Sequence, residues 1–207
     1  MIALFLSAFV TFFVVIDPPG CAPIFAGLTR GTDMAHRRAM AIRSTFVAGC
    51  ILLAFALLGQ PLLETLGISL DAFRIAGGIM LFLIALEMVF EKRQQRREHR
   101  AEEVAAHPEQ YEDISIFPMA MPMIAGPGSI ASAMLMMQRS HGWAAHGVVL
   151  AALTLNLLIM MGALLAAGPL MKLLGYKVEA VITRLLGVLL AALAAQFVVD
   201  GIRASFA

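Results

Sequence analysis

The residues best suited to chemistry in this chain are Asp17, Pro18, Pro19 and Gly20, which follow the uncharged, almost wholly apolar segment Met1–Ile16. A carboxylate inside a membrane-spanning segment costs about 2.5–3.5 kcal/mol on insertion scales unless it is paired or hydrated. Asp17 is therefore a candidate to bind a substrate ammonium group or a coupling cation, or to carry a proton. The structural alternative is that Asp17 caps a second helix that starts at the two prolines.

A second interruption of the same kind lies 108 residues later, at Gly126, Pro127, Gly128 and Ser129. Proline removes an amide donor and glycine permits strained backbone geometry, so both motifs are expected to unwind a helix. Unwound backbone at mid-membrane depth persists only where it is buried in protein or lines a water-filled cavity. Half-helix N-termini suit a carboxylate, whereas the unwound carbonyls and Asp17 suit an ammonium group or a cation. A single proline kink is usually structural, but two at equivalent positions of a repeat favour a zwitterion site.

Three further polar residues lie within apolar segments. Asn156 is expected to face the bundle interior, where it either bonds another helix or lines the site. Arg74 and Arg184 each precede a glycine by three residues. They either control access to the site from the two sides of the membrane, through contacts to Asp17 or Glu87, or anchor helix ends. Anchoring is the simpler interpretation.

The elements that must position these residues follow from composition. Sixty per cent of the 207 residues are hydrophobic and 14% are charged, against about 25% charged in soluble domains. The mean hydropathy is +0.86. These values predict an integral membrane protein. A net charge of +1 without a basic stripe argues against a nucleic-acid partner.

No constellation for enzymatic chemistry stands out in the sequence. The five histidines and two cysteines show no metal-ligand spacing, and no nucleophile is paired with a base. We therefore expect no enzyme activity, no metal site and no cofactor.

Apolar segments long enough to cross a membrane, about 20 residues, predict an all-α polytopic protein with six spans. They are Ile2–Leu28, Met40–Leu63, Ala72–Phe90, Ile114–Met137, Trp143–Leu165 and Ala180–Ile202.

An internal repeat relates the two halves of the chain. A shift of 108 residues aligns Ile16 with Ile124, Pro19-Gly20 with Pro127-Gly128, Pro61-Leu62 with Pro169-Leu170, Leu66-Gly67 with Leu174-Gly175, and Asp71-Ala72 with Glu179-Ala180. The predicted organisation is one three-helix repeat in residues 1–90, a charged loop in 91–113 and a second repeat in 114–207. Because three spans is an odd number, the halves must enter the membrane from opposite sides, as in many secondary transporters.

The distribution of basic residues predicts the orientation. Most of the lysines and arginines lie in the first, third and fifth connections. They are Arg30, Arg37, Arg38, Arg43, Lys92, Arg93, Arg96, Arg97, Arg100, Lys172 and Lys177. The odd loops are thus expected in the cytoplasm and both termini outside. The run Lys92–Arg100 is interpreted as a solvated loop that can contact anionic lipid.

Four blocks of the sequence resemble the MarC family of six-span membrane proteins. IDPPGCAPIF is similar to its NPxGxxPxF-like signature, and FPMAMPMIAGPGSIA (Phe117–Ala131) to its PLAxPxxAGPGxI signature. GISLDAFRIAGGIMLF (Gly67–Phe82) and VEAVITRLLGVLLAALAAQFVVDGI (Val178–Ile202) resemble two further blocks. The resemblance implies a 3+3 inverted repeat in a bacterial or archaeal inner membrane, and kinship with carriers of glycine and alanine. The family usually has Asn at the position of Asp17, so the local charge or the coupling ion is expected to differ here.

The leading hypothesis is a secondary transporter of small neutral amino acids. The substrate would bind between Asp17–Gly20 and Gly126–Ser129, with coupling to H⁺ or Na⁺. The alternative is a non-transporting membrane scaffold or sensor whose interruptions bind a lipid head group or a partner helix. A weaker third hypothesis, an intramembrane hydrolase, lacks a second suitably placed aspartate or a Ser–His pair. The direction of transport and the oligomeric state stay open.

Overall fold

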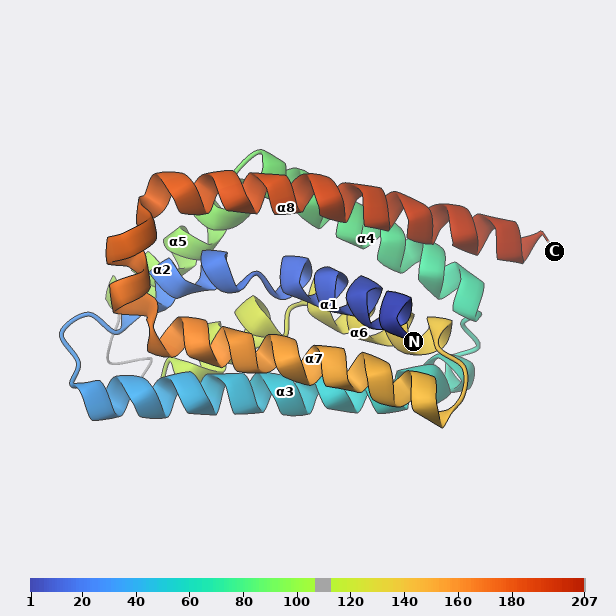
Figure 1. The fold of residues 1–207 in the computed structure, drawn as a ribbon, viewed down its shortest axis with the longest axis horizontal. Coiled ribbons are helices and arrows are strands. Elements are labelled where there is room, and N and C mark those ends of the chain that lie inside the picture. The colour runs from blue at the N-terminus through green and yellow to red at the C-terminus, as the bar shows by residue number, and fades with distance from the viewer. Residues whose placement is uncertain (107–112, 207) are drawn as a thin grey trace.

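The computed structural model describes residues 1–106 and 113–206, with the side chains of 105–106 and 171–177 outside that description. This part of the chain contains helices and no strand (Figure 1). The helices are α1 (Ile2–Ile16), α2 (Pro18–Leu28), α3 (Met34–Thr65), α4 (Leu70–Val89), α5 (Lys92–Ala106), the π-helix η2 (Ser115–Ile124), α6 (Pro127–Arg139), α7 (Trp143–Leu165) and α8 (Ala167–Ser205).

Five helical segments are long and apolar enough to cross a membrane: Ile2–Leu28, Met34–Thr65, Leu70–Val89, Trp143–Leu165 and Val178–Ser205. The pair η2 and α6, which bends by 52°, makes a sixth if it is counted as one span. The prediction of an all-helical polytopic membrane protein is therefore confirmed at this level.

Two predicted boundaries differ from the helices that form. Helix α3 begins at Met34 rather than Met40, because Asp33 caps it by accepting the His36 N–H at 2.6 Å. Helix α8 begins at Ala167 rather than Ala180, with Pro169 in its first turn, where proline is tolerated. The length of an apolar run predicts the part of a helix that crosses the membrane. The helix itself can continue beyond that run, as α3 and α8 do. Lys172 and Lys177 lie on α8, and their side chains are outside the described residues.

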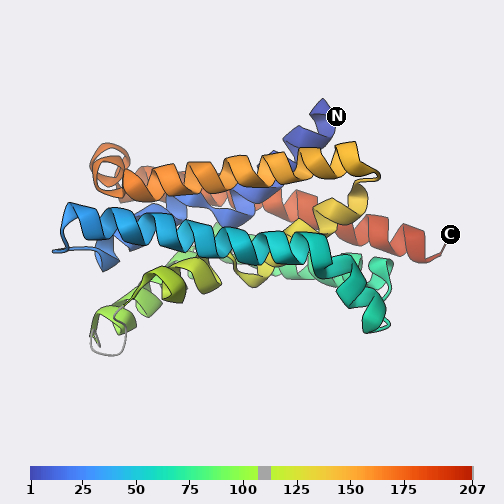
Figure 2. The ribbon, with the colours of Figure 1, turned by 90° about the horizontal axis from the view of Figure 1, so that it is seen from below.

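The charged segment Glu91–Asp113 is also largely helical, as α5 covers Lys92–Ala106; residues 107–112 are outside the description. Figures 1 and 2 place α5 and the α2–α3 turn at one end of the bundle, with the N- and C-termini toward the other. We call these the α5 end and the terminal end.

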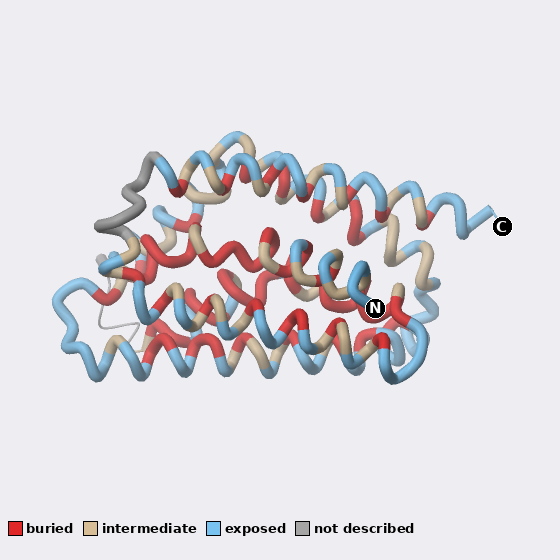
Figure 3. The backbone as a smooth tube through the Cα atoms, in the orientation of Figure 1, coloured by how far each residue is buried: buried red, intermediate tan, exposed pale blue. Residues whose placement is uncertain are grey.

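Burial is concentrated at the centre of the bundle. In Figure 3 the backbone around the α1–α2 junction and along α6 is mostly buried, whereas α3 and α8 alternate between buried and exposed. Large apolar side chains such as Phe46, Leu58 and Leu185 are exposed, which is expected of a surface that faces lipid. The two interrupted segments thus occupy the interior.

Helices α4 and α8 pack closely through glycines. A Cβ atom added at Gly78 would lie 2.8 Å from Val198 Cγ2 and 3.0 Å from the Ala194 carbonyl oxygen, and one at Gly187 would lie 3.1 Å from the Ala85 carbonyl oxygen. Small residues that let backbones approach are the usual means of helix association in membranes.

Gly78→Leu is therefore expected to destabilise the protein by about 1–3 kcal/mol, the typical cost of overpacking. Gly162→Leu on α7 is the matched control, because no described atom lies within 4 Å of the Cβ it would introduce. Thermal unfolding in detergent compares the two variants. Equal melting temperatures would contradict the glycine-mediated packing.

Candidate functional site

The first interruption is formed by Asp17, which separates α1 from α2. Asp17 adopts a left-handed conformation (φ 60°, ψ 64°) and its N–H donates to the Phe13 carbonyl at 3.0 Å. Its carboxylate accepts the Gly20 N–H at 3.1 Å and so caps α2, whose first two residues are the prolines. A Cβ at Gly20 would lie 2.3 Å from Asp17 Oδ2, so only glycine fits this junction.

The second interruption separates η2 from α6. Gly126 is the extended N-cap residue (φ −76°, ψ 171°), and no described side chain caps the helix that follows. A Cβ at Gly126 would lie 2.4 Å from the Pro122 carbonyl oxygen. One at Gly128 would lie 2.4 Å from Ile84 Cδ1. The first N–H groups of α6 therefore remain without an intrahelical partner, as at any helix start.

Helix α5 joins the two interruptions through a pair of arginines one turn apart. The Arg97 guanidinium donates to Asp17 Oδ2 at 2.7 Å and to the Met123 carbonyl at 3.5 Å. The Arg93 guanidinium donates to the Val15 carbonyl at 2.7 Å. The carbonyls at the ends of α1 and η2 thus receive donors from the same helix.

The Asp17–Arg97 ion pair is buried, with Asp17 1% exposed and Arg97 6% exposed. Burial and the positive charge of Arg97 lower the pKa of Arg93 to about 10, so Arg93 still carries its charge at neutral pH. Removing one member of a buried ion pair leaves an uncompensated charge, which is strongly destabilising. Asp17 therefore has a partner as well as a capping role.

A cavity of about 400 Å³, here called the inner cavity, opens between α4, α5 and the start of α6. Its lining includes the backbone of Gly126–Ser129 and four arginines, Arg93, Arg96, Arg97 and Arg100. Glu87 also lines it and forms an ion pair with Arg96. The excess of guanidinium groups beside an uncapped helix start suits an anionic group.

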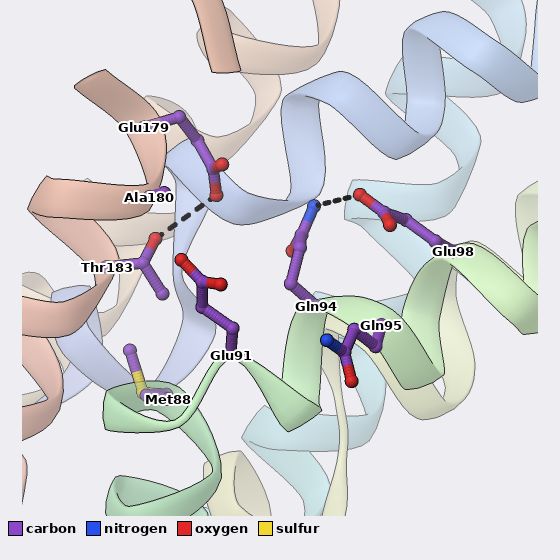
Figure 4. Close-up of a pocket in the computed structure, with 8 residues that line it drawn as sticks. All are labelled: Met88, Glu91, Gln94, Gln95, Glu98, Glu179, Ala180 and Thr183. Atoms are coloured by element: carbon purple, nitrogen blue, oxygen red, sulfur yellow. Dashed lines mark hydrogen bonds between the residues drawn. The ribbon is translucent and has the colours of Figure 1, made fainter. Parts of the chain in front are cut away.

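A second cavity of about 240 Å³ lies between α5 and α8 (Figure 4). Glu91 and Glu179 point into it, and Glu179, 4% exposed, accepts the Thr183 hydroxyl at 3.2 Å. No cluster of metal-binding side chains occurs among the described residues. Helix α5 is thus packed between this carboxylate-lined space and the arginine-lined inner cavity.

The remaining predicted site residues lie away from the inner cavity. Asn156 is buried on α7, where its amide donates to the Phe9 carbonyl of α1 at 3.2 Å and to the Ala152 carbonyl at 2.9 Å. It thus bonds another helix, which was one of its two expected roles.

The two repeat-related arginines lie at different places in their helices: Arg74 in the second turn of α4, and Arg184 in the middle of α8. Arg74 pairs with Asp71 at 3.4 Å, and Arg184 pairs with Glu91 at 2.5 Å. Among the described residues, the partners of these two arginines are therefore not Asp17 or Glu87, and the anchoring role stays a prediction.

Sequence reasoning missed the two arginines of α5. The high charge of residues 92–100 predicts a solvated loop, whereas these residues form part of α5. A usable signal was present: Arg93, Arg97, Ala101 and Val104 recur at helical spacing and form one face, on which Arg97 and Val104 are buried.

Comparison with known proteins agrees with this architecture. Residues 2–206 match the model of the MarC family integral membrane protein. A UPF0056 membrane protein of Methanocaldococcus jannaschii is 39% identical over 199 residues, covering 96% of both chains. The UPF0056 membrane protein YhcE of Escherichia coli is 33% identical over 200 residues, covering 96% of this chain and 91% of its own. No solved structure matches. With its interrupted, buried central helices and this match over nearly its whole length, the chain belongs to the MarC family of integral membrane proteins.

Proposed function

We propose that this protein is a secondary transporter of small neutral amino acids of the glycine and alanine class. The observation that carries the proposal is a buried carboxylate, Asp17, in a spanning segment, whose partner Arg97 also lines the cavity at the uncapped start of α6. The ammonium group of an amino acid would bind Asp17, and its carboxylate would bind at the start of α6. Gly128, against which Ile84 packs too closely for a Cβ, lines the inner cavity, whose limited size suits a ligand with a small side chain.

Arg97 has a defined part in this proposal. It occupies the position beside Asp17 that a substrate ammonium group or a coupling cation would take. In this arrangement the protein itself supplies the cation that balances Asp17. Substrate or a coupling ion, H⁺ or Na⁺, would compete with Arg97 for Asp17, and the arginines of the inner cavity would attract the substrate carboxylate.

An inverted repeat of residues 1–90 and 114–207 would provide the two alternating conformations. Two pairs of helices that correspond under the 108-residue shift contact one another: α3 with α7, and α4 with α8. In Figure 1, α3 and α7 run in opposite directions, as do α4 and α8. This arrangement supports a pseudo-twofold axis through the two interruptions.

The proposed orientation places the α5 end in the cytoplasm of a bacterial or archaeal cell and both termini outside its inner membrane. Single cysteines introduced at Gly31 and at His141, at opposite ends, test it by labelling with a membrane-impermeant maleimide. If Gly31→Cys is labelled in intact cells and His141→Cys is not, the orientation is the opposite of the one proposed.

A thermal-stability screen of the purified protein against the twenty amino acids tests the ligand class. A ligand that binds only the folded state at 100 times its Kd stabilises it by about 2.7 kcal/mol. We expect glycine and alanine to raise the melting temperature and large or charged amino acids to leave it unchanged.

The same screen distinguishes the scaffold or sensor alternative, which the four arginines of the inner cavity would also suit. That alternative predicts that an anionic phospholipid stabilises the protein and that none of the amino acids does. This result would refute the proposed transport function.

A further inference from the structure

A third cavity, here called the outer cavity, lies at the terminal end of the bundle. Its volume is about 330 Å³, and it is enclosed by the second half of α3, the end of α6 and the beginning of α7. The polar side chains that line it are Gln60, Glu64, Gln138 and His146, with Trp143 beside them.

Gln138 is the most informative of them. It is 9% exposed, and neither its Nε2 nor its Oε1 has a hydrogen-bond partner among the described residues. Buried amides are nearly always hydrogen-bonded, because an unpaired polar group forfeits the water that it bonded before folding. A donor and an acceptor side by side, both unpaired, lie in the wall of a cavity large enough for a small molecule.

The neighbouring polar groups retain free bonding capacity as well. Gln60 Nε2 donates to Glu64 Oε1 at 2.9 Å, which leaves the second carboxylate oxygen of Glu64 available. His146 bonds the Ser140 carbonyl through Nε2 at 3.0 Å, so its other ring nitrogen is free to act as an acceptor. The set therefore offers a carboxylate, an amide donor, an amide acceptor and an imidazole acceptor.

Helix α6 connects the outer cavity to the inner one. Gly128 and Ser129 at its start line the inner cavity, and Met134 and Gln138 near its end line the outer cavity. Thirteen residues of α-helix span about 20 Å. Ala133 and Leu135 between them are buried, so packed side chains separate the two spaces.

We propose that the outer cavity is a second binding site for the same small zwitterions, at the opposite mouth of the path from the inner cavity. Glu64 and Gln138 Oε1 bind the ammonium group, and Gln138 Nε2 donates to the carboxylate. This inference rests on the proposed transport function, and it adds a binding site that Asp17 does not form.

Protection of an introduced cysteine tests the outer site by itself. Gln60→Cys is placed in a chain with Cys21→Ala, Cys50→Ala, Asp17→Asn and Arg97→Gln. The first two changes remove the natural thiols, and the last two remove the carboxylate of the inner site without leaving the buried Arg97 charge unpaired. Leu66→Cys, exposed at the same end but outside the cavity lining, is the matched control. The rate of maleimide modification is measured with and without saturating alanine.

We expect alanine to slow modification of Gln60→Cys at least tenfold and to leave Leu66→Cys unchanged. Adding Gln138→Met should abolish that protection, whereas Gln196→Met, the same change at an exposed position of α8, should not. No protection of Gln60→Cys, while alanine still stabilises the wild-type protein against heat, would overturn the outer site and leave the transporter standing. No protection and no stabilisation of the wild type by any amino acid would overturn both.

Discussion

Asp17→Ala is expected to lower the free energy of unfolding by about 3–5 kcal/mol, because it leaves the buried Arg97 guanidinium without a counter-charge. The same change removes the side chain that accepts the Gly20 N–H, a cap worth about 0.5–2 kcal/mol. Urea or thermal unfolding in detergent measures the total loss. This is the largest stability effect that we expect of a single substitution at the site.

Asp17→Asn separates the charge from the cap, since asparagine caps a helix about as well as aspartate. We expect Asp17→Asn to lower the free energy of unfolding by most of the amount expected for Asp17→Ala. Combining it with Arg97→Gln should restore part of the stability, because the buried charge disappears with its partner. Stability of Asp17→Asn equal to that of the wild type, with additive losses in the double variant, would show that the ion pair contributes nothing.

Arg97→Gln is expected to expose the α5 end of the bundle. Arg97 connects α5 to both interruptions, through Asp17 and the Met123 carbonyl. The natural thiol of Cys21 is a built-in reporter, because it is buried in the first turn of α2. In a Cys50→Ala background, N-ethylmaleimide should react with Cys21 at least about tenfold faster in the variant, which corresponds to about 1.4 kcal/mol.

Arg96→Gln is the matched control for this measurement. Arg96 lines the same cavity on the same helix, but its ion pair with Glu87 is largely exposed. Exposed ion pairs contribute about 0–1 kcal/mol, so the rate should change less than about fivefold. If the Arg97 and Arg96 variants react equally fast, Arg97 does not hold α5 in place.

The sequence was most informative about features with local causes. Two prolines and a glycine after Asp17 predict an interrupted helix, because proline has no N–H to donate and Asp caps the helix that follows. Asp17 lies in the left-handed region between α1 and α2. The apolar lengths that predict spans are equally local, and five or six segments of the structure meet that criterion.

Features with distant causes were not predictable in this way. Arg97 is 80 residues from Asp17 in the chain, and no rule of spacing or propensity pairs them. Gln138 lies at the end of an apolar segment, where a polar residue is ordinarily solvated. Its burial depends on how α3 and α7 pack around α6.

Transport by the purified wild-type protein tests the central claim most directly. The protein is reconstituted into liposomes, and uptake of radiolabelled glycine and alanine is followed with and without H⁺ and Na⁺ gradients. The account predicts saturable uptake or exchange above that of protein-free liposomes, strongly reduced in Asp17→Asn and retained in Gln196→Met, a change at an exposed position of α8 outside both cavities. Absence of both uptake and exchange in a folded, correctly reconstituted sample would contradict it.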